Sequence, residues 1–102
     1  MEMHDAKRVS IVIEAPLESR LTDALNKAGV TGYTIMPVIG GSGRSGQWTR
    51  DGQVGRSGMV NVVCLIKPER LDGLLKAAFA VVEPHIGVVS VTAVPLLRAV
   101  RL

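Results

Sequence analysis

The sequence is poor in the residues on which covalent stabilisation and most catalysis depend. Its 102 residues include only 1 Cys, 2 His, 1 Trp, 1 Tyr and 1 Phe. A single Cys excludes an internal disulfide framework and a Cys-based zinc cage. Two separated His argue against a metal catalyst, so we predict no metal site. With so few aromatics, small aliphatic side chains must fill the core, and oligomerisation is a further source of buried surface.

Long hydrophobic runs and strong charge are also lacking. No apolar run reaches about 18 residues, so no membrane span or direct membrane insertion is predicted. The first residues, Met1–Asp5, include acids and no apolar stretch, which does not fit a secretory signal, and we expect a cytoplasmic protein. A net charge of +3 weakly favours anionic partners. With 47% hydrophobic and 21% charged residues, the composition predicts a single globular domain over residues 1–102.

Stretches rich in β-branched residues alternate with helical patterns. Strands are predicted at 8–14, 30–39, 59–66 and 87–94. Helices are predicted from Pro16 and from Pro68, because proline fits the first helical turn. Gly29 is a natural stop for the first helix, and Pro84 follows the second. The expected buried positions are Leu17, Leu21, Leu25 and Ala28 in the first helix, and Leu71, Leu74, Leu75, Ala78, Phe79 and Val82 in the second.

This order of elements is that of the α+β, ferredoxin-like βαββαβ sandwich. Its four-stranded antiparallel sheet carries the helices on one face. The first, third and last predicted strands are apolar on both faces, so the open face needs a cover, and a homo-oligomer supplies one simply. Pro37 places the second strand at an edge or a bulge. Residues 95–102 are predicted to form a short tail.

The segment Gly40–Gly58, between the second and third predicted strands, is the strongest functional feature. It holds seven of the 11 Gly and three Arg, and a loop of this length is generally functional or disordered. Gly-Arg-Ser-Gly occurs twice, at 43–46 and 55–58. Glycine backbone and arginine side chains suit an anion, although a solvated loop is the alternative. Trp48 in its middle is a candidate partner contact, unless it folds back onto its own domain.

Other chemistry-bearing residues give weaker signals. Cys64 is expected to be an inert core thiol, and His85 has no second metal ligand nearby. Arg98 and Arg101 suit a phosphate or form a solvated tail. No nucleophile–base pair, phosphate-binding loop motif or dinucleotide motif is present. The central strands lack aromatic residues for base stacking, so no nucleic-acid partner is predicted.

Residues 29–44, GVTGYTIMPVIGGSGR, resemble the PII signalling family. Its second strand carries Gly-[Ile/Val]-x-Gly-x-Thr and leads through Gly-x-Gly-Arg into a long T-loop. Gly41-Ser42-Gly43-Arg44 supplies that second stretch, one residue later than in the common pattern. The order of elements, the position of the loop and the chain length agree as well, so the resemblance covers nearly the whole chain.

Departures from the family pattern indicate the branch. The nucleotide loop after the second helix usually contains Thr-Gly-x-x-Gly-x-Gly-Lys, whereas Glu83–Ser90 has no lysine and one glycine. The T-loop also lacks the tyrosine that can be uridylylated. Both departures argue against a nitrogen sensor that uses ATP, magnesium and 2-oxoglutarate. The Gly- and Arg-rich loop instead resembles PII-like proteins of inorganic-carbon uptake, including carboxysome-associated ones.

The resemblance implies a homotrimer with adenine nucleotides in the clefts between subunits. Thr34 and Ile66 would then contact the adenine, and Gly87 and Val88 would line the opposite wall. The implied phosphate-binding residues are Gly41, Ser42, Gly43, Arg44, Arg98 and Arg101. Trp48, Arg50 and Arg56 would contact a partner from the T-loop.

The resulting hypothesis is a non-enzymatic regulator that prefers ADP or AMP. ATP and bicarbonate are further candidate ligands, and a bicarbonate transporter or a carboxysome-related protein is the candidate partner. One alternative is a metal-tolerance-type or structural trimer without a nucleotide site. Another is an acylphosphatase, whose anion loop would follow the first strand, where Glu14-Ala15-Pro16 is hostile to phosphate.

Overall fold

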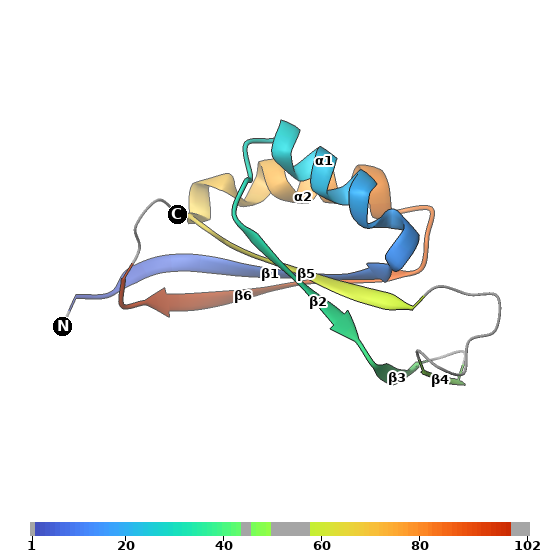
Figure 1. The fold of residues 1–102 in the computed structure, drawn as a ribbon. Coiled ribbons are helices and arrows are strands. Elements are labelled where there is room, and N and C mark those ends of the chain that lie inside the picture. Colours follow the sequence, from blue (N-terminus) through green and yellow to red (C-terminus); the bar gives the residue numbers. More distant parts are fainter. Residues whose placement is uncertain (1, 44–45, 50–57, 99–102) are drawn as a thin grey trace.

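A four-stranded antiparallel sheet carries two helices on one face in the computed structural model, which describes residues 2–43, 46–49 and 58–98 (Figure 1). The sheet has the strand order β2-β5-β1-β6. Its strands are β1 (His4–Glu14), β2 (Tyr33–Val38), β5 (Met59–Ile66) and β6 (Gly87–Leu96). This is the predicted α+β, ferredoxin-like topology.

Each helix is entered through a short 3-10 turn that contains a proline. The turn Ala15–Leu17 leads into α1 (Glu18–Lys27), and the turn Pro68–Arg70 leads into α2 (Leu71–Val82). Gly29 has φ 84°, so the predicted helix stop is confirmed: a left-handed residue follows the helix, where only glycine is free of strain. Within the described part of the chain, neither helix is long and apolar enough to cross a bilayer.

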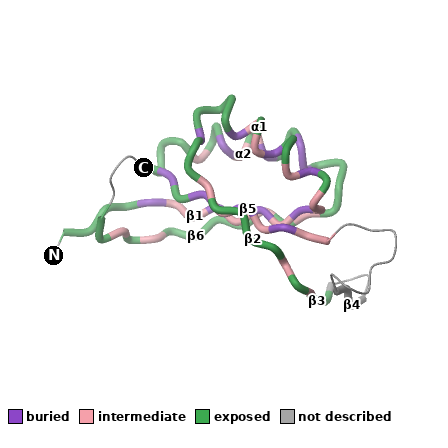
Figure 2. Tube along the Cα trace, viewed as in Figure 1, coloured by how far each residue is buried: buried purple, intermediate pink, exposed green. Residues whose placement is uncertain are grey.

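The core lies between the helices and the sheet, where Figure 2 shows the buried positions facing each other. Its fully buried side chains include Ile11, Ile13, Leu21, Leu25 and Leu74. Two predicted core positions are wrong. Ala28 is exposed because it caps α1, and Phe79 is 45% exposed because it lies one helical step from the buried stripe of Leu74, Ala78, Val81 and Val82.

The strand boundaries differ from the sequence prediction where pairing extends or shortens a strand. β1 begins four residues early, at His4, because His4–Lys7 pair with β6. Pro95 was expected in the tail but pairs with Asp5, so β6 reaches Leu96. β2 is shorter than predicted and lies at the sheet edge, which confirms the position expected from Pro37.

The segment predicted as a loop contains a two-stranded ribbon. β3 (Gly40–Gly43) pairs with β4 (Gly46–Thr49) in an antiparallel ladder separate from the main sheet. Backbone hydrogen bonds make such a ladder, so glycine-rich sequence of low strand propensity can form it.

Candidate functional site

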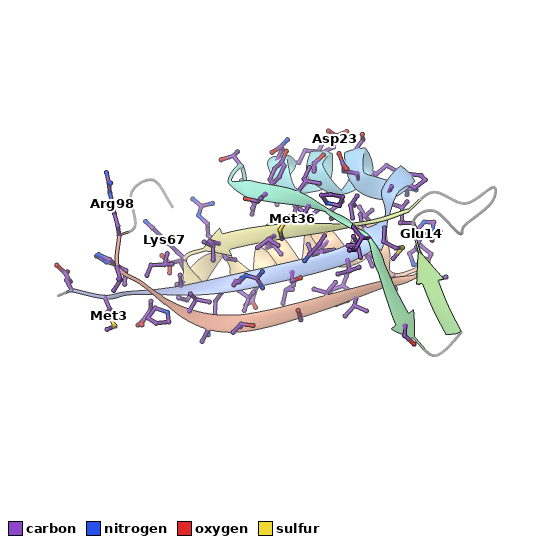
Figure 3. The ribbon with its side chains drawn as sticks, turned by 60° about the horizontal axis from the view of Figure 1, so that its bottom comes forward. Met3, Glu14, Asp23, Met36, Lys67 and Arg98 are labelled. Carbon is purple, nitrogen blue, oxygen red and sulfur yellow. The ribbon has the colours of Figure 1, made fainter. Side chains whose placement is uncertain are left out.

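The predicted site residues divide between the two ends of the sheet. At the loop end, β2 finishes beside the start of β5 and the end of β1, since Val38 pairs with Met59 and Met59 with Glu14. At the opposite end of the sheet, Ile66 pairs with Lys7 and is followed by Lys67. We call this the basic end because of these lysine side chains. Figure 3 shows Glu14 at one end, and Lys67 and Arg98 at the other.

The base of the predicted T-loop lies at the loop end. Gly41 and Ser42 are exposed on β3, and Gly43 ends this strand. Trp48 belongs to β4, opposite Gly41. Of the other predicted residues here, Arg44, Arg50 and Arg56 lie outside the described residues.

Gly87 and Val88 begin β6, also at the loop end. A Cβ on Gly87 would lie 2.9 Å from the Val12 carbonyl oxygen and 2.9 Å from Val82 Cγ1. The packing of β6 against β1 and α2 therefore requires glycine, whatever binds nearby. Val88 is 64% exposed and lies opposite Val12 on the sheet face away from the helices.

The turn before Gly87 is closed by two backbone hydrogen bonds. The Glu83 N–H donates to the Phe79 carbonyl at 3.0 Å, and the His85 N–H donates to the Val82 carbonyl at 2.8 Å. A hollow of about 400 Å³ lies between this turn and the neighbouring strand, lined by Phe79, Val82, Glu83, His85, Gly87 and Val89. The titratable groups among these lining residues are a carboxylate and an imidazole.

Backbone groups near the basic end are left outside the ladder. β2 pairs with β5 only as far as Tyr33 opposite Cys64, whereas β5 continues through Leu65 and Ile66. β5 also pairs with β1 through both residues, and the Ala15 N–H donates to the Gly58 carbonyl in the same register, so the backbone groups of Ile66 face Lys7 whereas those of Leu65 face the side that β2 has left. This edge can donate and accept hydrogen bonds, as the edge of a purine base requires.

The surroundings of that edge are open. Thr34 is exposed on β2, and a Cβ on Gly32 would meet nothing within 4 Å. Ile66 differs from the expectation of base packing, because its side chain is 3% exposed and lies in the core. Its backbone groups face Lys7 of β1, so the backbone contact at this edge falls to Leu65. Arg98 is exposed beyond β6, and Arg101 lies outside the described residues.

Within one chain, the predicted site residues at the loop end lie far from those at the basic end. Ile66 is six residues from Val60 along β5, and Val60 is joined through Ile13 to Gly87. At ~3.3 Å per residue, the separation along the strands is about 20 Å. One chain therefore carries the predicted site residues in two groups, one at each end of its sheet.

Cys64 lies in the core, and the possible metal ligands of the described residues form no cluster. The Cys64 side chain is fully buried, and desolvation raises the pKa of its thiol from 9.0 to about 11. This confirms the predicted inert core thiol, because the thiolate is the reactive and metal-binding form. No group of three or more potential metal ligands occurs among residues 2–43, 46–49 and 58–98.

Comparison with protein families identifies the fold's relatives. The family model for nitrogen regulatory protein P-II matches residues 6–101. The chain belongs to the P-II family. This confirms the resemblance drawn from residues 29–44 and from the order of elements. No curated protein matches the chain at a significant level.

Solved structures of PII-like proteins align with nearly the whole chain. CPII from Thiomonas intermedia K12, bound to ADP, AMP and bicarbonate, has a TM-score of 0.82 and 26% identity, over 95% of this chain and 92% of that one. The same protein bound to ADP and bicarbonate gives a TM-score of 0.79 and 28% identity, over 95% and 93%. A putative PII-like signalling protein from Thermus thermophilus, at 24% identity over 94% and 92%, has a TM-score of 0.70 and supports the fold alone.

Proposed function

We propose that this chain is a non-enzymatic PII-like regulator that binds adenine nucleotides between the subunits of a homotrimer. The division of the predicted site residues between opposite ends of the sheet carries the proposal. Its relative CPII, of the same fold, has been seen with ADP, AMP and bicarbonate. The regulator acts in the cytoplasm and contains no catalytic residue.

The base binds at the basic end of one subunit. There, the backbone of Leu65 forms hydrogen bonds with the purine edge, next to Ile66, and Thr34 lies beside it. Gly32 leaves the space open for the ring, because nothing in the described part of the chain, apart from the residues next to it in sequence, lies within 4 Å of its would-be Cβ. Arg98 from this end binds phosphate together with Arg101, since a guanidinium matches phosphate oxygens.

The phosphates also meet the loop end of the neighbouring subunit. Gly41, Ser42, Gly43 and Arg44 approach them from the loop base, while Gly87 and Val88 provide the wall through their backbone. The tight turn at Glu83 and His85 brings no ammonium group to this wall. ADP and AMP are therefore favoured over ATP, whose additional charge would lack a partner.

Bicarbonate is the proposed second ligand, bound by the arginine-rich loop base. The two ligands together order residues 40–58, and the ordered loop presents Trp48, Arg50 and Arg56 to a partner. Ligand contacts would offset the entropy of fixing so many glycines. The proposed partner is a bicarbonate transporter or a carboxysome-related protein.

Calorimetric titration tests nucleotide binding directly. Purified protein is titrated with ADP, AMP and ATP, each with and without bicarbonate. We expect one ADP or AMP per subunit, and tighter binding when bicarbonate is present, because the coupling between two ligands is reciprocal. Replacing Arg98 by Ala should weaken ADP binding several-fold, whereas Arg20→Ala, an exposed change on α1, should not. Absence of binding by all three nucleotides would refute the proposed function.

Mixed oligomers test whether the site is shared between subunits. One variant carries Arg98→Ala and Arg101→Ala, and the other carries Arg44→Ala. When equal amounts assemble at random, about a quarter of the clefts receive two unaltered halves. We expect about a quarter of the clefts in the mixture to bind ADP with the affinity of the wild type. A mixture that binds no better than the two variants separately would place the whole site within one chain.

A further inference from the structure

Fixed charge is distributed unevenly between the two ends of the described structure. At the basic end, the charged side chains of the described residues include five cations, Lys7, Arg8, Lys67, Arg70 and Arg98, and four carboxylates, Glu2, Asp5, Glu69 and Asp72. At the loop end, the charged side chains of the described residues include Glu14 and Glu83, with His85 beside them. A polyanion is therefore drawn by the described charges to the basic end.

Of the five cations, Arg70 and Arg98 already have a structural or proposed role, and Lys7 and Arg8 belong to β1, one strand inward from the open edge of β5. The Arg70 guanidinium donates to the Gly29 carbonyl at 3.4 Å, beyond the end of α1. Lys7 shares a strand face with Asp5, and both line a hollow of about 410 Å³. Arg98 belongs to the proposed phosphate site. This leaves Lys67 without an assigned role.

Lys67 is exposed and directly follows Ile66, where β5 runs past the end of its pairing with β2. It thus adjoins the edge at which the base is proposed to bind. Figure 3 shows Lys67 and Arg98 at the same end of the sheet. A lysine ammonium is a flexible point charge with three donors, which suits a phosphate whose position is fixed by other contacts.

We propose that Lys67 is a phosphate-binding residue of the shared nucleotide site. The inference rests on the proposed function and names a residue that the PII resemblance did not supply. Lys67 provides an ammonium from the base-binding subunit, whereas the turn at Glu83 and His85 provides none from its neighbour. In consequence, the strength of ADP binding depends on the charge at position 67.

The test compares ADP affinity in three variants and the wild type by calorimetry. Lys67→Ala should weaken ADP binding about tenfold, the usual scale for loss of one charged hydrogen bond. Lys67→Arg should stay within about twofold of the wild type, because it keeps the charge. Lys76→Ala, which removes an exposed lysine from α2, should leave the affinity unchanged.

Two results would overturn the inference while leaving the proposed function in place. One is equal ADP affinity in Lys67→Ala and the wild type. The other is a loss in Lys67→Arg as large as that in Lys67→Ala, which would assign the effect to side-chain shape. If the wild type binds no nucleotide, the proposed function itself is refuted and the inference falls with it.

Discussion

Replacing Gly87 by Ala should destabilise the fold without removing any contact. The added methyl would stand 2.9 Å from the Val12 carbonyl oxygen, 2.9 Å from Val82 Cγ1 and 3.3 Å from Ile13 Cγ2. The carbonyl belongs to the β1 backbone and Ile13 is fully buried, so neither has room to withdraw. Overpacking of this kind costs about 1–3 kcal/mol.

Thermal unfolding followed by circular dichroism measures the effect, at one fixed protein concentration because oligomerisation contributes to stability. In a domain of this size, about 1 kcal/mol lowers the Tm by roughly 4–8 °C, so the expected decrease is about 4–24 °C. Gly73→Ala is the matched control: nothing lies within 4 Å of its would-be Cβ, and alanine favours a helix by about 0.5–1 kcal/mol. If Gly87→Ala melts at the wild-type temperature, the packing argument is refuted.

Two further predictions concern the buried core. Stability should fall as pH rises from 9 towards 11, because burial raises the Cys64 pKa to about 11 and the unfolded chain releases the thiol proton first; Cys64→Ala should flatten this pH dependence in urea unfolding, and an unchanged slope would contradict the assignment. Ile11 is fully buried, so Ile11→Ala should cost about 2–5 kcal/mol in urea unfolding, against about 0.5–1.5 kcal/mol for Ile11→Val. Equal costs for these two variants would argue against a tightly packed core at this position.

Local sequence predicted the order of elements because each element carries its own signal. β-branched runs mark the centres of the strands, and prolines mark both helix entries. The ends of the strands lack such signals. His4–Lys7 has no apolar alternation typical of a strand, yet it forms one because β6 lies alongside it. The β3–β4 ribbon likewise depends on pairing between glycine-rich segments, which propensity does not report.

The chemistry of the site was partly readable from the sequence, but its division between subunits was not. The glycine and arginine motifs predicted an anion site, since these residue types bind anions through general physical properties. β5 extends past the end of its pairing with β2 because of the register between the two strands. The residues Leu65 and Ile66 do not by themselves determine that register. For the same reason, the sequence predicts a base contact for Ile66, whereas its side chain is buried and its backbone groups face β1, so the contact falls to Leu65.

Gly87 and Gly32 differ in how much space the surrounding chain leaves for a side chain. At Gly87, packing against Val12 and Val82 accounts for the missing side chain by itself. Apart from the residues next to it in sequence, nothing in the described part of the chain lies within 4 Å of a would-be Cβ on Gly32, so packing within that part does not require glycine there. Gly32 directly precedes Tyr33, the last partner of β5 before its unpaired end. Gly73 in α2 is equally open, so open space by itself does not require a ligand; at Gly32 it leaves room for one against the edge of β5.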